Sequence, residues 1–579
     1  MKRLRLLMII LVLVPFISVT VTAQDDIPRE ETLIVEHAQS TQPNFTNYNW
    51  MVPGSVLRAA GFHNFLMEPL FMLNLESGEI EGWQGESMTP NETLDVWTLK
   101  IREGVTWADG ESFNADDVVF TIEMLKENAP AMVNSASIDR QVERVEKIDD
   151  LTVEFYLTSP NPRFQLDNFS VRVWQSVMMV PEHVWRDKDP LTFTFYDPEQ
   201  GWPLGTGAFT LTNTSETEFI FDRDDDWWGA TSGFTDLPAP RRIIYILNQS
   251  EERRAALAVN DEADIAWDMG LGTYEAIVAQ NPNWITWNND PLQAWMDTCA
   301  RGFVINTVDE PWSDPNLREA INQAVDRQEI NVFAFDGITV PSRSMYPEYE
   351  AMFPFIEAMA AEGMTLNSTA NPDRARELIE GAGYTLNNGF YEKDGEVLGI
   401  NIQALEATPD RIRMIEVVVE QLRRVGIDAT MQRLTNTTLW ENRDTGNFEA
   451  LDDGASCGSV NEPITSLERF ANNLLMPVGE RASGNYGRWS GEDNDRYSEI
   501  VAELAALPLD DEQVLPLTLE AQQIWREAIP YLPLVNAKFL LSFNTTYWEN
   551  WPTADNNYFQ PAYWWNSAHS IVHSIEPAQ

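Results

Sequence analysis

Two short motifs in this 579-residue sequence have residue types and spacing that could do chemistry. Gly454-Ala-Ser456-Cys-Gly458 matches G-x-S-x-G, the turn that presents a nucleophilic serine in many hydrolases. That turn needs a strand before it and a helix straight after it, whereas Asp452-Asp453 precede this one and Pro463 follows shortly. A secreted serine hydrolase is therefore only a remote alternative.

The second motif is a histidine pair, His569 and His573, spaced to lie on one face of a helix. The chain has only five His, and the sequence shows no third ligand beside the pair, so no metal site and no cofactor are expected. Cys299 and Cys457 are the only cysteines. Two cysteines allow a single pairing and cannot build a zinc site alone.

The elements around these residues have α/β character. Residues 97–102 alternate apolar and polar side chains, which is typical of a half-buried strand, and Asp109-Gly110 then predicts a turn. Asn114 is placed to cap the next helix, with Asp117 completing a capping box. This segment therefore predicts a strand, a turn and a helix.

The second half of the chain also alternates predicted helices and strands. Asp314-Pro315 and Asn371-Pro372 each predict a helix start, because proline at the first helical position loses no hydrogen bond, and Gly381 is available to end the second helix. A strand near 398–405, a helix from Thr408-Pro409 to Gly426 and a further strand follow. Such a unit implies a parallel strand pair with a right-handed crossover.

The N-terminus predicts export. Lys2, Arg3 and Arg5 precede the apolar run Leu6 to Val14, and Val21-Thr-Ala23 offers small residues for cleavage. Residues 1–23 are therefore expected to be a signal peptide, although a retained membrane anchor is the alternative. The apolar stretch is shorter than the ~20 residues of a spanning helix. The mature protein is expected to be periplasmic or extracellular, at the outer face of the cytoplasmic membrane.

Length and charge restrict the function classes. One core rarely grows beyond ~300 residues, so at least two lobes are expected. The net charge of -51 excludes nucleic acid as a partner, because its phosphates are bound by Lys and Arg. The acidity fits either a cationic ligand or a salty habitat, and it concerns solubility more than fold.

Several segments, in this order, resemble the family 5 extracellular solute-binding proteins of ABC importers, which bind oligopeptides, dipeptides or nickel. No single segment is specific, but the ordered set is. The segments are Trp97–Phe120, Leu204–Phe209 with Asp226-Trp-Trp228, Asp261–Ile265, Phe303–Asn306, Asp314–Ala320 and Ala324–Arg327.

The resemblance implies a type II periplasmic-binding-protein-like α/β fold, with two lobes joined by a hinge and an extra sub-domain in lobe one. Lobe one is expected to span 24–298 and lobe two 299–535, with 536–579 returning to lobe one. The ligand would lie between the lobes, which close by hinge bending. The implied protein is no enzyme but a monomer that captures a peptide-like ligand and delivers it to a membrane permease.

Site residues also follow from the resemblance. Cys299 and Cys457 are placed like the disulfide of oligopeptide-binding members, the alternative being two free thiols. Oligopeptide-binding members carry an aspartate that pairs with the amino terminus of the peptide, and this chain has Ser459 at the matching position. Asp452 or Asp453, which lie nearby, could take over that role. The alternative is that these two aspartates form a solvated acidic turn. Arg443 resembles an arginine able to grip a ligand carboxylate, unless it forms a surface ion pair.

The remaining expected contacts are aromatic and polar. Trp50-Met51-Val52 resembles the segment that lies along a bound peptide, and Trp440 could stack on a side chain or a sugar unless it belongs to the core. An oligosaccharide or a nickel chelate is therefore the alternative ligand on the same scaffold. The expected ligand-binding residues are Trp50, Met51, Val52, Trp440, Arg443, Asp453, Ser456, Ser459 and Asn461.

Overall fold

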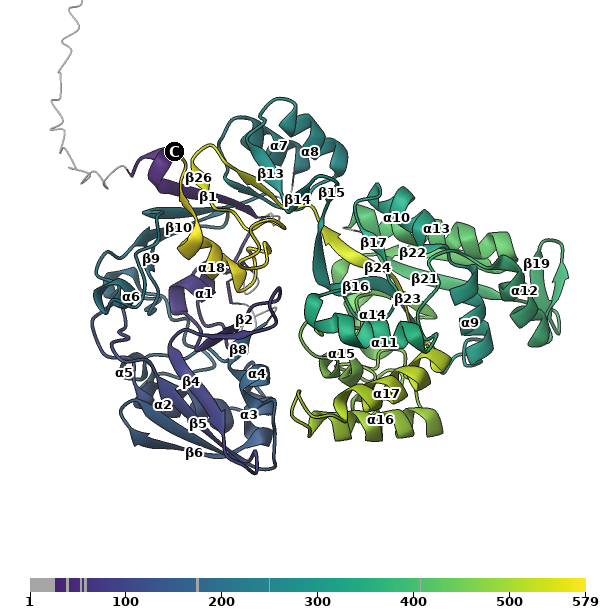
Figure 1. Ribbon diagram of the computed structural model, residues 1–579, viewed down its shortest axis with the longest axis horizontal. Coiled ribbons are helices and arrows are strands. Elements are labelled where there is room, and N and C mark those ends of the chain that lie inside the picture. Colours follow the sequence, from purple (N-terminus) through teal and green to yellow (C-terminus); the bar gives the residue numbers. More distant parts are fainter. Residues whose placement is uncertain are drawn as a thin grey trace, which may run out of the picture.

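The computed structural model of the protein describes residues 27–37, 41–52, 55–56, 60–172, 176–248, 250–406 and 408–579. The expected signal peptide, residues 1–23, lies outside the described residues. Figure 1 shows two α/β bodies side by side, one built mainly from the N-terminal half and the other from the green C-terminal half. Within the described part, no helix is long and apolar enough to span a membrane.

Lobe one is built on a seven-stranded sheet in which β1 lies parallel to both β11 and β12. Strand β25, from the C-terminal segment, is inserted between β12 and β13, so both ends of the chain contribute to this sheet. In order across the sheet, the strands are β13 (Trp284–Thr286), β25 (Ser542–Asn544), β12 (Ile265–Ala266), β1 (Thr32–His37), β11 (Arg242–Leu247), β10 (Glu218–Arg223) and β9 (Phe209–Thr214).

A four-stranded antiparallel sheet with helices α2 (Ala115–Glu127) and α3 (Ser135–Gln141) forms the far end of lobe one (Figure 1). Helix α2 begins with the predicted capping box, in which Asn114 and Asp117 each accept a backbone N–H. The predicted strand at 97–102 is β5. The strands are β4 (Gly85–Pro90), β5 (Val96–Ile101), β7 (Thr152–Leu157) and β6 (Val142–Asp149).

Lobe two contains a six-stranded sheet. Its β21–α13–β22 unit confirms the predicted parallel pair: α13 runs from Pro409 to Val425, and Gly426 ends it with a φ of 98°, which suits glycine. In order, the strands are β17 (Val340–Pro341), β24 (Tyr531–Phe539), β16 (Trp295–Ile305), β23 (Ala450–Asp453), β21 (Gly399–Leu405) and β22 (Asp428–Leu434).

The chain passes between the lobes at β16 and β24, which pair antiparallel from Trp295–Phe539 onward at the junction in Figure 1. Beyond Phe539 the chain enters β25 of lobe one within a few residues. Two neighbouring crossings of this kind allow the lobes to hinge without a flexible tether.

Further helices and strands surround the sites described below. They are α1 (Phe62–Met67), β2 (Phe71–Leu73), α4 (Phe164–Asn168), β8 (Ser170–Val171), α6 (Trp228–Thr231) and α18 (Ser567–Ser574) in lobe one, and α14 (Asn436–Thr445), α15 (Ile464–Glu468) and α16 (Glu492–Ala505) in lobe two. Helices α9 (Pro315–Ala324) and α12 (Pro372–Gly381) begin where the sequence predicts.

Candidate ligand-binding cleft

A cleft of about 1040 Å³, part of it open to solvent, lies between the two lobes. Lobe one contributes residues of α4 and β8, and lobe two contributes the ends of α14 and β23, the disulfide loop and α15. The lining residues are Asp167, Ser170, Arg172, Ser176, Cys299, Arg443, Asp453, Gly454, Cys457, Gly458, Thr465 and Arg469. The cleft therefore combines three guanidinium groups with two carboxylates.

Arg443 and Asp453, both predicted from the sequence, line this cleft together. Arg443 Nη1 lies 3.8 Å from Asp453 Oδ2, a long ion pair. The guanidinium is held between the rings of Trp440 and Tyr486, at 4.6 and 4.3 Å from their centroids, and also binds Asp444. Burial alone would lower the pKa of Arg443, but Asp453 and the other neighbours outweigh it and raise that pKa, so the group stays charged.

Asp453 keeps one acceptor available. Its Oδ1 accepts a hydrogen bond of 2.8 Å from the backbone N–H of Gly454. Its Oδ2 is buried and accepts no hydrogen bond from any residue that the structure describes. Because a buried carboxylate oxygen is costly to leave without a donor, Asp453 is suited to receive one from a ligand.

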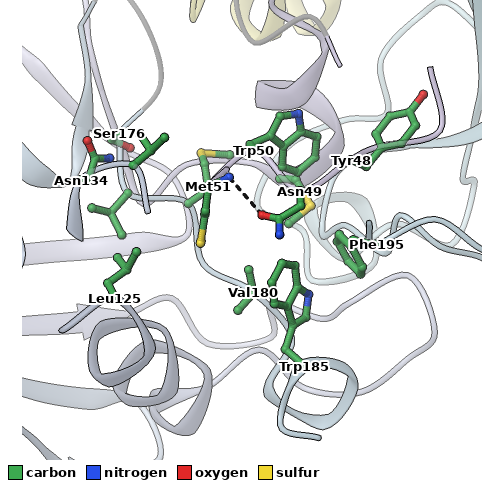
Figure 2. A pocket seen from close by; sticks show the side chains of 14 residues that line it. Tyr48, Asn49, Trp50, Met51, Leu125, Asn134, Ser176, Val180, Trp185 and Phe195 are labelled. Carbon is green, nitrogen blue, oxygen red and sulfur yellow. Dashed lines mark hydrogen bonds between the residues drawn. The ribbon is translucent and has the colours of Figure 1, made fainter. Parts of the chain in front are cut away.

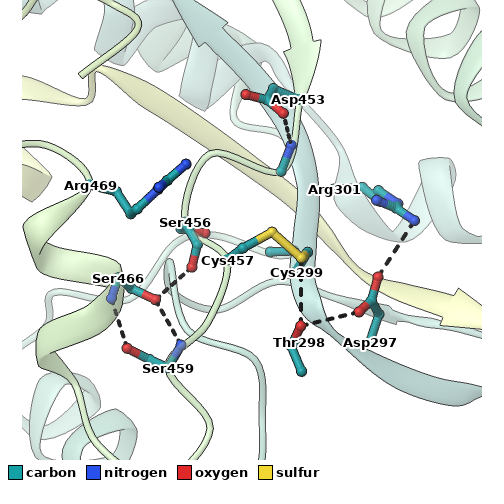
Figure 3. The surroundings of a disulfide bond; sticks show 12 residues. Asp297, Thr298, Cys299, Arg301, Asp453, Ser456, Cys457, Ser459, Ser466 and Arg469 are labelled. Atoms are coloured by element: carbon teal, nitrogen blue, oxygen red, sulfur yellow. Dashed lines mark hydrogen bonds and ion pairs between the residues drawn. A yellow bond between two sulfur atoms is a disulfide. The ribbon is translucent and has the colours of Figure 1, made fainter. Parts of the chain in front are cut away.

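The disulfide loop closes one end of the cleft. Cys299 and Cys457 form a disulfide whose Cα atoms are 4.2 Å apart, just under the usual ~4.4–6.8 Å. Ser456 and Ser459 are fully buried beside it (Figure 3). Ser456 Oγ donates to the carbonyl of Met345, and Ser459 Oγ accepts from the backbone N–H of Ser466. These two side chains stabilise the loop.

This geometry does not support a nucleophile elbow. Contrary to expectation, a strand does precede the G-x-S-x-G motif, since β23 ends at Asp453. The next helix, however, begins only at Ile464, and Ser456 has no solvent exposure with its hydroxyl directed into the fold. The motif is a buried turn of the disulfide loop.

Trp50, Met51 and Val52 lie elsewhere. Trp50 and Met51 line an apolar pocket inside lobe one, where Figure 2 shows them near Val180 and Trp185. All three side chains are buried, and Ser176 alone lines both this pocket and the cleft. Asn461 is half-buried, with an Oδ1 that has no hydrogen-bond partner among the described residues. The structure therefore brings together Arg443 and Asp453, and places Trp50–Val52 apart from them.

The lobe-one wall was not predicted. Arg172 Nη1 donates to Thr465 Oγ1 of lobe two across 2.7 Å, and Arg163, at the start of α4, pairs with Glu462 of lobe two at 2.8 Å. Both partners of the second pair are buried. The indication of these arginines in the sequence was weak. Arg163 and Arg172 are two of 39 basic residues in a chain with 90 acidic ones, so ion pairs with carboxylates are expected for them, but the partners are not.

Comparisons with known proteins agree with this architecture. The family model for bacterial extracellular solute-binding proteins, family 5, matches residues 79–473. The glutathione-binding protein of Shigella flexneri is 26% identical over 349 residues, 60% of this chain but only 61% of that protein. The nickel-binding periplasmic protein of Escherichia coli is 22% identical over 66% of this chain and 69% of its own length.

Solved structures show the same fold. A periplasmic oligopeptide-binding protein of an ABC transporter from Thermotoga maritima superposes with a TM-score of 0.82 at 20% identity, covering 95% of this chain and 99% of that one. Its mannohexaose-bound form gives 0.77 at 21% identity over the same shares of each chain. With the family model matching more than half of the sequence, the chain belongs to the bacterial extracellular solute-binding proteins of family 5.

Proposed function

We propose that this protein captures a short peptide-like ligand with charges of both signs in the interlobe cleft and delivers it to the permease of an ABC importer. It acts outside the cytoplasmic membrane, as a monomer and without catalysing a reaction. The observation that carries the proposal is the pairing of Arg443 and Asp453 in one cleft with Arg172 and Arg469.

Charge complementarity favours a zwitterion. Arg443 binds Asp444 through Nε and Nη2, which leaves Nη1 for a ligand carboxylate, and the rings of Trp440 and Tyr486 hold the guanidinium in place. Asp453 offers an acceptor for an ammonium group. When the lobes close, the ligand's polar groups lose water and must find protein partners, and a neutral ligand would give Asp453 Oδ2 no charged donor.

An oligosaccharide or a nickel chelate is the competing ligand class. One solved relative contains mannohexaose, and one curated relative is named for nickel. Here the cleft is lined by charged groups, and Trp440, the expected sugar platform, is covered on one side by the Arg443 guanidinium. That arrangement suits a charged ligand better than a sugar ring.

A thermal-shift screen of short peptides, manno-oligosaccharides and nickel–histidine chelates tests the ligand class, because a ligand that binds only the folded chain raises Tm. A hit is then titrated by calorimetry against Arg443→Ala and Asp453→Ala. The exposed residues Arg433 and Asp373 provide matched controls as Arg433→Ala and Asp373→Ala.

We expect peptides to raise Tm, and each cleft variant to lose about 2–5 kcal/mol of binding free energy while the controls lose none. Stabilisation by an oligosaccharide alone, or peptide binding unchanged in both cleft variants, would refute the charge-pair proposal.

A further inference from the structure

A second group of charged and titratable side chains lies inside lobe one, away from the cleft. Glu68 directly follows helix α1, and His569 and His573 lie one turn apart on α18. The nearest ligand atoms of these three residues all lie within 4.8 Å of one another. His569 Nε2 is 3.7 Å from Glu68 Oε1. The carboxylate supplies the third group that the sequence did not show beside the histidine pair.

The two imidazoles lack the partners that buried polar groups normally have. Neither imidazole nitrogen of His569 or of His573 has a hydrogen-bond partner in the described part of the chain. Glu68 and His569 have relative exposures of 1% and 0%. Four orphaned nitrogens in one spot are exceptional, because nearly all buried polar atoms in native proteins are paired.

Glu68 also lacks a counter-charge. Its two oxygens accept hydrogen bonds of 2.9 Å from the indole N–H groups of Trp83 and Trp228. No Lys or Arg forms an ion pair with it among the described residues; the basic side chains beside it are His569 and His573. A buried carboxylate of this kind is stabilised by a cation from outside the protein or by a proton.

The surrounding walls suit a cation. The ring of Trp83 lies 4.2 Å from that of His569 and 5.1 Å from that of His573, centroid to centroid, and Trp227 lies 5.1 Å from His573. Aromatic rings attract a cation near their faces. His573 is half-buried, and both of its ring nitrogens are buried.

The backbone fixes the three groups in place. Glu68 has a φ of 55°, which side-chain-bearing residues seldom adopt, so the chain holds this carboxylate at a conformational cost. Helices α1 and α18 pack so closely that a Cβ built on Gly61 would lie 2.7 Å from that of Ala568. Both sides of the cluster are therefore anchored.

We propose that Glu68, His569 and His573 form a binding site for a zinc-class divalent metal ion, which fastens the C-terminal helix α18 to α1 inside lobe one. Two imidazoles at i and i+4 on a helix with one carboxylate form a set that Zn²⁺ accepts. Its bonds of about 2.0–2.2 Å require the side chains to turn inward slightly, and a water completes the fourth position.

Metal content of the full chain tests the site. The protein is treated with a chelator, dialysed against Zn²⁺ and then against buffer, and bound zinc is measured by mass spectrometry. We expect about one zinc per chain in the wild type, and none in Glu68→Gln or His573→Ala. His183→Ala is the matched control, because His183 is a half-exposed surface histidine paired with Asp109, and it should keep the zinc.

Two further measurements keep the test decisive if a variant misfolds. Zn²⁺ should raise the Tm of the wild type and of His183→Ala by several degrees but leave folded Glu68→Gln unchanged. Zinc-soaked wild-type crystals should show an anomalous peak between Glu68, His569 and His573. A wild type that retains no zinc, a full zinc content in Glu68→Gln, or a peak elsewhere would overturn the proposal.

Discussion

Glu462 and Glu68 are both almost completely buried carboxylates, yet their surroundings differ. Glu462, at the lobe interface, faces Arg163 at 2.8 Å and Arg172 at 3.8 Å, and it also accepts backbone N–H groups. Burial would raise its pKa, but these partners outweigh burial and lower the pKa. For Glu68, burial dominates the two indole donors and raises the pKa to about 8.

The difference shows that partners, more than burial, decide what a buried carboxylate does. The cations of Glu462 come from the opposite lobe, so its charge is satisfied only while the lobes are together. Glu68 receives none from a Lys or Arg among the described residues, so a proton or an external ion must neutralise it. Glu462 thus stabilises the closed arrangement of the lobes, whereas Glu68 belongs to the proposed metal site.

The largest expected effect is the loss of the charge on Glu462. Glu462→Gln removes the buried ion pair of Arg163 across the lobes and leaves Arg163 only Asp167 of its own lobe, at 3.1 Å, which costs the closed arrangement about 3 kcal/mol, the low end for breaking a buried pair. The lobes should therefore open, and apparent ligand affinity should fall because fewer molecules are competent to bind. Small-angle scattering should show a larger radius of gyration in the ligand-free variant.

The exposed Glu420→Gln is the matched control for that experiment, since its side chain is 70% exposed. A radius of gyration equal to that of the wild type in Glu462→Gln would mean that the pair does not hold the lobes together.

A second, smaller effect is expected at Thr465. Its hydroxyl accepts hydrogen bonds from Arg163 and Arg172 of lobe one and donates to Glu462. Thr465→Val keeps the shape and removes all three, so the closed form should lose about 1–3 kcal/mol. Ligand titration measures this loss, and it should shrink in an Arg172→Ala background; equal losses in both backgrounds would contradict the shared contact.

Closure should also depend on pH through Glu468. Burial raises the pKa of this carboxyl to about 7, Arg163 and Arg172 oppose the shift, and Asp167 and Glu462 add to it. Because Glu468 has this raised pKa in the closed form, the closed form binds its proton more tightly than the open form does. Closure is therefore most favoured below the ordinary pKa of a glutamate, and it weakens as the pH rises through about 7. Scattering at pH 5.5–8.5 (about 1.5 units either side of that pKa) should show this opening in wild type and not in Glu468→Gln; an opening retained in the variant would exclude Glu468.

Local structure was predictable where one short segment determines it. The capping box at Asn114 and the β21–α13–β22 unit follow from local spacing, and the structure confirms both. Helix α12 ends at Gly381, the glycine that the sequence offers, and the left-handed residue after it is Gly383, with a φ of 90°.

The cleft was predictable only in part. Arg443 and Asp453 come from one lobe and from segments with recognisable neighbours. Arg172, Thr465 and the Arg163–Glu462 pair depend on how two distant segments meet, which no local pattern encodes. Likewise His569 and His573 showed a helical spacing, whereas Glu68 joins them from the other end of the chain.

The smallest expected effect is that of Glu68→Gln on the stability of the zinc-free protein. In zinc-free protein, Glu68→Gln removes no ion pair with a Lys or Arg of the described chain, and it exchanges one indole hydrogen bond for a less favourable contact. The free energy of unfolding should therefore fall by about 1 kcal/mol, the low end for a buried donor left without its acceptor. Urea unfolding in the presence of a chelator measures it, with Glu420→Gln as the control. A loss as large as that expected for Glu462→Gln would show that the protein itself supplies Glu68 with a cation. The two carboxylates would then be alike, and the reason for an external ion at Glu68 would disappear.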